Sequence, residues 1–313
     1  MPVLHEHPSP SSLVPLLQSH LPTSLPTLST LVTPGNPLKV YTTFPTSHEP
    51  STAEPGPELP WIVLIDAGNQ FRFFCSQTPT ETTSNDDGTK AEELLYEVLG
   101  QVMDQASREK RDIVRIGAIH DRWTRVVERV TGVECMSASR IWCDPAYFGD
   151  HKPATTTSSE EELRLPEGFE IREAEEEDVP IILSTSEVPH LPSYLLTRLS
   201  HTSCIFRRSS SNSSSSDAEL VAHVTTHRDG SLGTLYVNPS CRRLGLARLV
   251  LQHRLSKMRK EARDSKLGFC YVHRENEASR AVMKSLGWRE SEENVWWNIV
   301  DVQEWVNRQK LRN

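Results

Sequence analysis

The stretch Val237-Asn238-Pro239-Ser240-Cys241-Arg242-Arg243-Leu244-Gly245-Leu246-Ala247 decides the fold of this chain. The apolar residues 235–237 predict a strand that leads into it, and a helical pattern follows without a gap. The apolar stripe of that predicted helix consists of Ala247, Val250, Leu251, Leu255, Met258 and Ala262. Strand, turn and helix in this order aim free backbone N–H groups and the positive end of a helix dipole at one point.

Such a point binds phosphate. Gly245 lets the backbone approach an anion where a Cβ would collide, and Arg242 and Arg243 add donors that match phosphate oxygens. The alternative is an ordinary strand-to-helix turn followed by a basic surface helix. The two common phosphate loops do not fit, because GxxxxGK[ST] is absent and Gly245 lacks the partner glycines of GxGxxG. A different phosphate-bearing ligand is therefore needed.

A second block follows downstream. Residues 266–272 predict a buried strand, and a helix is expected to begin at the N-cap Asn276 and to end before Gly287, which suits the C′ position. The predicted apolar stripe of this helix is Ala278, Ala281, Val282 and Leu286. On these grounds alone, Asn276 and Ser279 cap the helix and face solvent.

The two blocks together resemble the GNAT acyltransferase superfamily. Residues 242–247 match its coenzyme A pyrophosphate loop, R/Q-x-x-G-x-G/A, with alanine in the last small position. Residues 276–288 resemble its N-x-A-S-x-x-x-Y-x-x-L-G-F element. The resemblance implies acyl-CoA, such as acetyl-CoA, as a co-substrate and no permanently bound cofactor. The residues expected to hold the pyrophosphate are Arg242, Arg243, Leu244, Gly245, Leu246 and Ala247.

The same resemblance implies a place for the rest of coenzyme A. In a GNAT fold two central strands splay apart, here expected at residues 232–237 and 267–272. The pantetheine arm would pair with the exposed backbone of Leu235, Tyr236 and Val237, since unpaired strand groups are ready partners for its amides. Asn276 and Ser279 would donate hydrogen bonds to the pantetheine–phosphate part.

The N-terminal half extends the resemblance. Residues 16–25, the Gly35-Asn36-Pro37 turn and the strand beginning at Trp61 resemble the opening of the glycine N-acyltransferase family. In that family a degenerate GNAT-like half precedes the coenzyme A-binding half. We therefore expect an α/β fold with two GNAT-like domains, the C-terminal one with a central mixed, splayed β-sheet flanked by helices.

The expected boundaries are residues 1–152 for the first domain, 153–166 for a linker and 167–313 for the acyl-CoA-binding domain. The linker is assigned by its Pro, Thr, Ser and Glu composition. The predicted order of the second domain is a strand at 168–172, helices near 175–186 and 193–200, and strands at 204–207, 219–226 and 231–237. A final hairpin through Trp296-Trp297 is expected to close the same domain.

Composition limits the class of protein. A hydrophobic fraction of 36% and a charged fraction of 24% fit a soluble globular chain, and the net charge of −8 argues against a dedicated nucleic-acid binder. No apolar run approaches the roughly 20 residues that a membrane span needs. The six cysteines form no CxxC and no metal-ligand spacing, so we expect them reduced in a cytoplasmic monomer that holds no metal. Residues 1–10 contain no Lys or Arg and fit no targeting signal well, which leaves a mitochondrial setting open.

The expected catalytic groups are partly missing. GNAT enzymes attack directly, so Cys204, Cys241 and Cys270 are expected to be packed or surface thiols. The tyrosine that often serves the superfamily as general acid is replaced by Met283. The glutamate proposed as base in the glycine acyltransferases is also missing, because Ser231 follows the Asp-Gly turn and no carboxylate occurs before Pro239. A base must come from elsewhere.

His223 and His227 are the candidates for that base. They lie four residues apart on a predicted strand, so they share a face, and imidazole accepts a proton near neutral pH. The alternative is that His223 is a packed strand residue and His227 an exposed turn residue. Tyr236 is a candidate acid unless it belongs to the core, and a backbone N–H at residues 235–237 is the expected oxyanion donor.

The sequence thus predicts an acyl-CoA-dependent N-acyltransferase that moves an acyl group to the amine of an amino acid or similar small acceptor. One alternative is a non-catalytic acyl-CoA-binding sensor or interaction protein, which the missing tyrosine and glutamate permit. Another is a protein N-acetyltransferase, which shares the co-substrate and differs in the acceptor.

Overall fold

The computed structural model describes residues 4–33, 38–44, 59–68, 70–77, 85–145, 164–208, 218–261 and 268–312. Most of the predicted linker, Leu267 and Ala262 lie outside these ranges. Contacts divide the chain into two compact units, Met1–Arg140 with Ser291–Asn313, and Ile141–Glu290. This division differs from the sequence-based boundaries, because the end of the chain packs with the N-terminal half.

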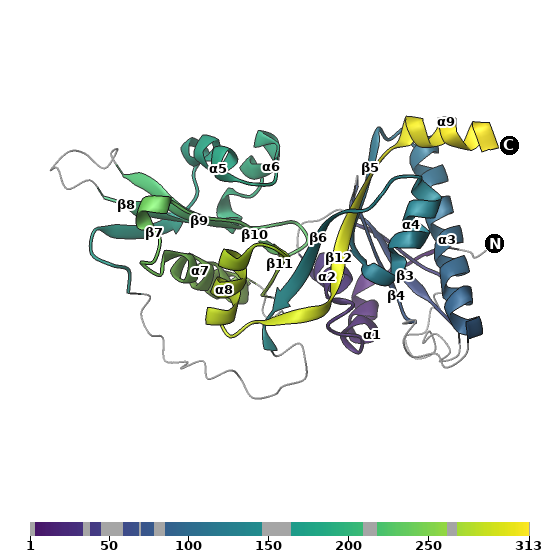
Figure 1. Cartoon of the computed structure of the whole chain (residues 1–313), viewed down its shortest axis with the longest axis horizontal. Coiled ribbons are helices and arrows are strands. Elements are labelled where there is room, and N and C mark those ends of the chain that lie inside the picture. Colours follow the sequence, from purple (N-terminus) through teal and green to yellow (C-terminus); the bar gives the residue numbers. More distant parts are fainter. Residues whose placement is uncertain are drawn as a thin grey trace. The chain divides into compact units, whose positions relative to one another are not determined.

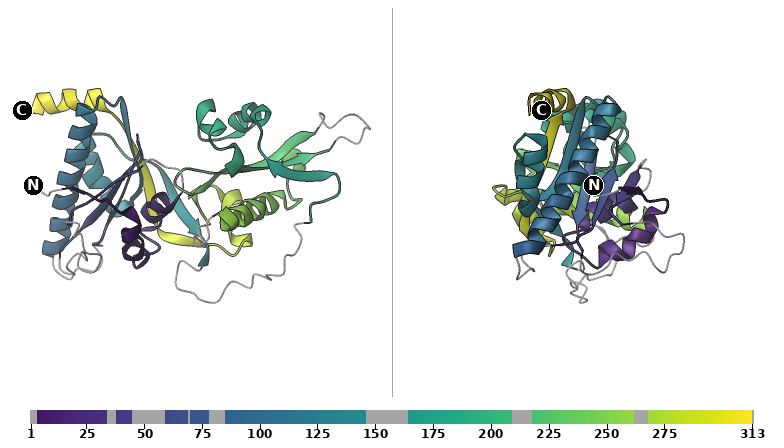
Figure 2. Two further views of the ribbon diagram at one scale, coloured as in Figure 1. Left: turned by 180° about the vertical axis from the view of Figure 1, so that it is seen from behind. Right: turned by 90° about the vertical axis from the view of Figure 1, so that its right-hand side faces the viewer.

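The first unit is built on a sheet with strand order β1-β2-β3-β4-β5-β12. Its strands are β1 (His5–Glu6), β2 (Lys39–Thr42), β3 (Ile62–Asp66), β4 (Gln70–Cys75), β5 (Ile113–His120) and β12 (Arg289–Asp301). The helices α3 (Asn85–Arg108), α4 (Thr124–Thr131) and α9 (Val302–Arg312) cover one face, and α1 (Val14–Gln18) and α2 (Leu25–Val32) cover the other (Figures 1 and 2).

The strand β3 explains why both faces of this sheet are covered. Ile62 and Leu64 pack into the cluster beneath α3, whereas Val63 and Ile65 pack into the cluster beneath α1 and α2. Since successive side chains point to opposite faces, an uninterrupted apolar run requires a helical layer on each side.

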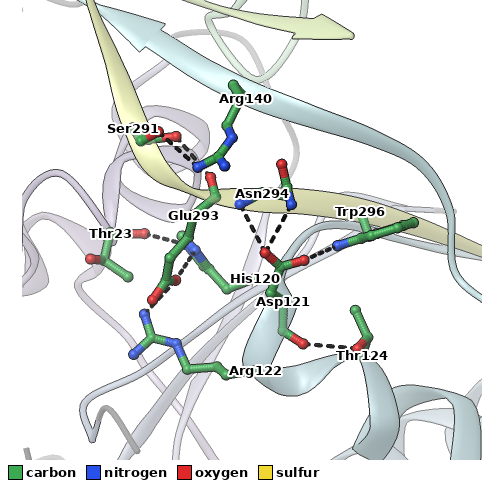
Figure 3. A network of polar contacts seen from close by, with 10 residues as sticks. All are labelled: Thr23, His120, Asp121, Arg122, Thr124, Arg140, Ser291, Glu293, Asn294 and Trp296. Atoms are coloured by element: carbon green, nitrogen blue, oxygen red, sulfur yellow. Dashed lines mark hydrogen bonds and ion pairs between the residues drawn. The ribbon is translucent and has the colours of Figure 1, made fainter. Parts of the chain in front are cut away.

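The strand β12 corrects one sequence-based expectation. The predicted final hairpin of the C-terminal domain is wrong, because β12 pairs antiparallel with β5 of the first unit, with Val295 opposite His120 and Val300 opposite Val114. Polar contacts stabilise the start of the pairing between β12 and β5 (Figure 3). Glu293 accepts hydrogen bonds from Arg122 at 2.9 Å and faces His120 Nδ1 at 3.0 Å, and Asp121 accepts two from Asn294. The alternating pattern of residues 289–301 identifies a strand without identifying its partner.

The second unit has the strand order β11-β10-β9-β8-β7. Its elements are β7 (Phe169–Glu173), β8 (Thr202–Arg207), β9 (Glu219–Thr226), β10 (Leu232–Val237), β11 (Phe269–His273), α5 (Val179–Thr185), α6 (Pro192–Leu196), α7 (Leu246–Glu261) and α8 (Glu277–Ser285). In Figure 1, α5 and α6 lie on one face of this sheet and α7 and α8 on the other. The strand β6 (Met136–Cys143) enters the unit at Ile141.

The two units repeat one topology. In the first, the antiparallel pair β3–β4 leads through α3 to β5, which runs parallel to β4; in the second, β9–β10 leads through α7 to β11, which runs parallel to β10. The predicted fold class, an α/β protein of two similar halves with a mixed sheet flanked by helices in the second, is confirmed.

The buried faces of α7 and α8 differ in part from the apolar stripes predicted for them. In α7, Val250, Leu251 and Leu255 are buried as expected, but so is Arg254, which donates to Thr226 Oγ1 and Ser200 O. The stripe expected for α8 is wrong at Ala278 and Ala281, which are exposed.

Met283 is the buried residue of α8 instead. The helix ends as predicted at Gly287 (φ +75°), where Trp288 N–H bonds Met283 O and Gly287 N–H bonds Lys284 O. This turn brings the large Met283 and Trp288 side chains into one apolar cluster, and the small alanines are left outside it.

Candidate functional site

The strand β10 is half open along its length. It pairs antiparallel with β9 from Leu232 to Val237, with a register shift between Gly233 and Tyr236. Thr234 lies within this bulge at a φ of +51°. On the other side, Leu232 opposite Cys270 is the one pair with β11 found among the described residues. Residues 233–237 are accordingly half-buried, and this edge of β10, at Leu235, Tyr236 and Val237, is free to pair with an extended ligand.

A loop of exposed residues connects β10 to α7. Asn238 caps a short helical turn by accepting from Ser240 N–H, and Cys241 and Leu246 are buried at the two ends of the loop. Arg242, Arg243, Leu244 and Gly245 between them are exposed. Two buried anchors therefore hold the loop at both ends while its backbone remains accessible.

The backbone of this loop presents uncommitted donors. The first helical hydrogen bond runs from Leu249 N–H to Gly245 O at 3.1 Å, so the N–H groups of Leu246, Ala247 and Arg248 precede it and lack intrahelical partners. Arg243 and Gly245 both adopt left-handed backbone angles, with φ of +67° and +78°. Left-handed residues before a helix turn successive N–H groups toward one concavity that attracts anions.

Gly245 leaves that concavity open. No heavy atom lies within 4 Å of the position that a Cβ would occupy on Gly245. A side chain there would enter the space above the loop, and its backbone would be strained by the positive φ.

The two arginines of the loop differ in their contacts. Arg242 Nε lies 3.4 Å from Val237 O, so this side chain folds back along the end of β10. Arg243 makes no ion pair or hydrogen bond to another residue within the described ranges. Its guanidinium is therefore available to an anionic ligand.

Asn276 and Ser279 lie at the start of α8. Asn276 Oδ1 accepts a hydrogen bond from Ser279 N–H at 3.0 Å, which is the N-cap that the sequence predicts. Both residues are half-buried. The Asn276 amide nitrogen and the Ser279 hydroxyl make no hydrogen bond with the rest of the described chain, so capping leaves two donors available.

His223 is enclosed in the unit. It lies within β9, is fully buried, and its Nε2 lies 2.8 Å from Thr185 Oγ1 of α5. Its ring stacks on Tyr236, the residue opposite it on β10, at a centroid distance of 5.5 Å. Burial lowers the pKa of His223 to about 4. The ring is therefore neutral at pH 7 and out of reach of solvent.

His227 lies one residue beyond β9 and is half-buried. Its Nδ1 lies 2.7 Å from Tyr194 Oη of α6, and burial lowers its pKa to about 4. The opposite edge of the ring faces β10, since a Cβ on Gly233 would lie 2.3 Å from Nε2. His223 and His227 therefore meet α5 and α6, respectively, and lie on the same side of the sheet.

Sequence reasoning missed Tyr194, His190 and Gly233, which surround His227. His190 and Tyr194 precede His227 by more than 30 positions and carry no motif, so no local pattern links them. Gly233 carried a weak signal, because a glycine within a strand indicates a close approach of another group.

Asp229 and the three cysteines of this unit singled out by the sequence have structural surroundings. Asp229 accepts hydrogen bonds from Ser231 N–H and Oγ and serves the turn. Cys204, Cys241 and Cys270 are buried, and burial raises the pKa of the Cys204 and Cys270 thiols. Within the described ranges, no group of three or more His, Cys, Asp or Glu side chains is arranged to hold a metal ion. The described helices include none with the length and apolarity to cross a membrane.

Comparisons with known proteins agree with this fold. A model of the FR47-like protein family matches residues 213–297, which contain β10, the loop, α7, β11 and α8. No curated protein sequence matches the chain. A solved Drosophila protein is similar over 96% of this chain and 100% of its own length, at 18% identity and a TM-score of 0.63.

Two further structures are less similar. A tandem GNAT protein from the clavulanic acid biosynthesis pathway shares 12% identity over 96% of this chain and 99% of its own, with a TM-score of 0.47. A GCN5-related N-acetyltransferase from Kribbella flavida shares 14% identity over 77% of this chain and 86% of its own, with a TM-score of 0.44. At such identities the similarity concerns the fold.

Proposed function

We propose that this chain is an acyl-CoA-dependent N-acyltransferase of the GNAT type, with its acyl-CoA site in the second unit. The observation that carries the proposal is the loop between β10 and α7. It combines uncommitted N–H groups at a helix N-terminus, two left-handed residues and open space above Gly245. It also follows a strand whose edge is unpaired beyond Leu232 among the described residues.

Acyl-CoA is a substrate here, and no permanently bound cofactor is proposed. Its pyrophosphate would bind the backbone N–H groups of residues 243–248 and the free Arg243 side chain. Its pantetheine arm would pair with the backbone of Leu235, Tyr236 and Val237, and the Asn276 amide and Ser279 hydroxyl would donate to it. The thioester would then lie near the bulge at Thr234.

The reaction needs a proton acceptor beside the thioester. The amine nitrogen attacks the thioester carbonyl, a C–N bond forms, and the C–S bond breaks to release the coenzyme A thiolate. His227 is the proposed acceptor of the amine proton, because its Nε2 edge faces β10 at Gly233. It would return a proton to the thiolate, while a backbone N–H of β10 stabilises the oxyanion. His223, enclosed against Thr185, would support this strand through its stacking on Tyr236.

The proposed acceptor is the amine of an amino acid or a similar small molecule, as in the glycine N-acyltransferase-like proteins that the N-terminal half resembles. A protein amine would use the same chemistry. We place the protein in the cytoplasm as a monomer, which accords with its six free cysteines.

One observation favours a second candidate, an acyl-CoA-binding sensor without efficient turnover. Met283 occupies the position of the superfamily's frequent tyrosine acid, and it is only 2% exposed. Neither its chemistry nor its location lets it donate a proton.

The enzyme and the sensor would both bind coenzyme A at the loop between β10 and α7, and a Gly245→Glu variant tests this shared prediction. The new side chain and negative charge enter the space above the loop, so we expect affinity, measured by isothermal titration calorimetry, to fall by more than 100-fold. Gly168→Glu is the matched control, because Gly168 also has a positive φ (+81°) and open space around it. Full affinity in Gly245→Glu would refute the proposed site.

Turnover separates the enzyme from the sensor. Acetyl-CoA and longer acyl-CoA are incubated with the protein and a panel of amines, and free thiol release is followed. An N-acyltransferase releases thiol only when an accepted amine is present. Tight coenzyme A binding without amine-dependent thiol release across the panel would favour the sensor.

A further inference from the structure

The ring of His227 is held from one side by a small aromatic cluster. His190 precedes α6, Tyr194 belongs to α6, and the three rings lie with centroids 5.3 to 5.9 Å apart. Within this cluster, Tyr194 Oη and His227 Nδ1 form the one hydrogen bond, at 2.7 Å. This bond fixes the rotation of the imidazole about its Cβ–Cγ bond.

Gly233 holds the ring from the other side. A Cβ at this position would lie 2.3 Å from Nε2 and 2.7 Å from Cδ2 of His227, so only glycine lets the imidazole approach β10 this closely. Gly233 directly precedes the bulge at Thr234, and it follows Leu232, where the pairing with β11 is observed. The Nε2 edge therefore lies at the point where the two central strands part.

The backbone of His227 is fixed as well. The buried Arg198 donates through Nε and Nη2 to Thr226 O, at 2.9 and 2.6 Å. His227 N–H bonds Ser231 O at 2.8 Å, and Gly230 N–H bonds His227 O at 3.0 Å. A half-buried histidine at the end of a strand is thus held at its backbone, at Nδ1 and along its Nε2 edge.

We propose that Tyr194 is a positioning residue for His227, whose Nδ1–H donates to the Tyr194 oxygen and whose Nε2 therefore faces β10 as the unprotonated, basic nitrogen. The proposal rests on the proposed function. During the reaction the amine proton would move to Nε2, and the Nδ1–H bond to Tyr194 would persist in the resulting imidazolium. Nε2 would then give its proton to the departing thiolate, so the ring returns to the same tautomer.

The groups around the His227 ring determine how readily the imidazolium forms, because they raise or lower the pKa of His227. Burial is the largest cause that lowers the pKa of His227, and the nearby Asp229 carboxylate acts in the opposite direction. His190 before α6 and Arg198 after it add to the lowering. The Arg228 guanidinium lies over the Tyr194 ring, 5.7 Å from its centroid. An oxygen of Tyr194 at Nδ1 stabilises the imidazolium more than the neutral ring, because a hydrogen bond from a cation is stronger.

The tautomer of His227 can be measured by NMR spectroscopy, and the measurement does not depend on enzymatic activity. The 15N chemical shifts of the His227 ring, assigned by comparison with a His227→Gln variant, report which nitrogen carries hydrogen at pH 7. We expect hydrogen on Nδ1 in the wild type and loss of that preference in Tyr194→Phe, which keeps the ring and removes the hydroxyl. Hydrogen on Nε2 in the wild type would overturn the proposal, whatever the activity of the protein.

Kinetics give the second test, with an amine that the wild type accepts. In Tyr194→Phe we expect kcat to fall about tenfold, KM for acyl-CoA to remain unchanged, and the acidic limb of the pH–rate profile to move to lower pH. Tyr96→Phe, in α3 of the first unit, is the matched control and should leave all three unchanged. A fall in rate with an unmoved pH profile would indicate a merely structural role for Tyr194, and unchanged kinetics would also overturn the proposal.

Gly233→Ala provides an independent variant. The added Cβ displaces the His227 ring from β10, so we expect the rate to fall while the Kd for coenzyme A, measured by calorimetry, stays within about twofold. An unchanged rate would mean that the Nε2 edge at Gly233 has no part in the reaction. If the wild-type protein does not bind coenzyme A, the proposed site itself fails.

Discussion

His223 and His227 show how the environment sets the chemistry of one residue type. Both come from the same short segment, yet one is fully buried and bonded to a threonine, whereas the other is half-buried and bonded to a tyrosine. Burial lowers the pKa of each to about 4. Both rings are therefore neutral in the folded protein at pH 7, and their contribution to stability depends on pH.

That dependence has a definite sign. In the unfolded chain these histidines take up protons near pH 6.5, but in the folded protein they do so only near pH 4. The unfolded state thus binds more protons between these values, and stability falls as pH falls. Each histidine contributes a loss of about 1.4 kcal/mol per pH unit in this window.

Urea unfolding at pH 7, 6 and 5 measures this loss. We expect a smaller decline in His223→Gln, because the glutamine does not titrate. Equal declines in the variant and the wild type would mean that His223 is not held neutral by burial.

The helix α7 is the element that joins the loop to the core. Val250, Leu251 and Leu255 fix its inner face, and its N-terminus presents the free N–H groups that follow Gly245. Its two ends carry exposed arginines in different settings. Arg243 precedes the first turn without a partner in the described structure, whereas Arg259 in the last turn lies 3.8 Å from Asp144.

Alanine substitutions at these two arginines separate local from general charge effects. We expect Arg243→Ala to raise the Kd for coenzyme A about tenfold, because one charge-assisted hydrogen bond to a phosphate is lost. Arg259→Ala removes the same charge from the other end of the helix and should leave the Kd nearly unchanged. The difference, measured by calorimetry, should shrink as salt is added. Equal effects of the two variants would argue against a local contact at Arg243.

At the scale of the whole molecule, the last segment of the chain belongs to the first unit. Trp305 of α9 is 6% exposed, its Nε1–H donates to Val130 O at 2.9 Å, and it packs in the cluster of α3 and α4. The chain therefore leaves the first unit after Arg140 and returns to it at Ser291. The folded first unit therefore includes the C-terminal segment of the chain.

Trp305→Ala tests this arrangement. Removal of a buried tryptophan costs about 3–5 kcal/mol. We expect amide hydrogen exchange to accelerate in β3, β4 and β5 while β8 and β9 keep their protection. Phe269→Ala, in β11 of the second unit, is the matched control and should give the opposite pattern. Faster exchange confined to the second unit in Trp305→Ala would contradict the observed division of the chain.

The sequence by itself determined what depends on near neighbours. The order strand, loop and helix at residues 232–261, the N-cap at Asn276 and the helix end at Gly287 all follow from residues a few positions apart. Caps, turns and periodicity are local because backbone sterics and hydrogen-bonding reach act over one or two turns.

Only the tertiary structure decided which distant groups meet. No local sequence pattern predicts that β12 pairs with β5 or that Tyr194 bonds His227. Nor does the local pattern predict that Met283 is buried in place of Ala278. The alternating pattern of β12 is compatible with pairing in either unit's sheet. The contact between Tyr194 and His227, 33 positions apart, forms only when α6 packs on the sheet. The sequence alone thus predicted the loop. The contacts of His227 with Tyr194 of α6 and with Gly233 of β10, which only the tertiary structure brings about, assembled the group proposed to carry out the chemistry.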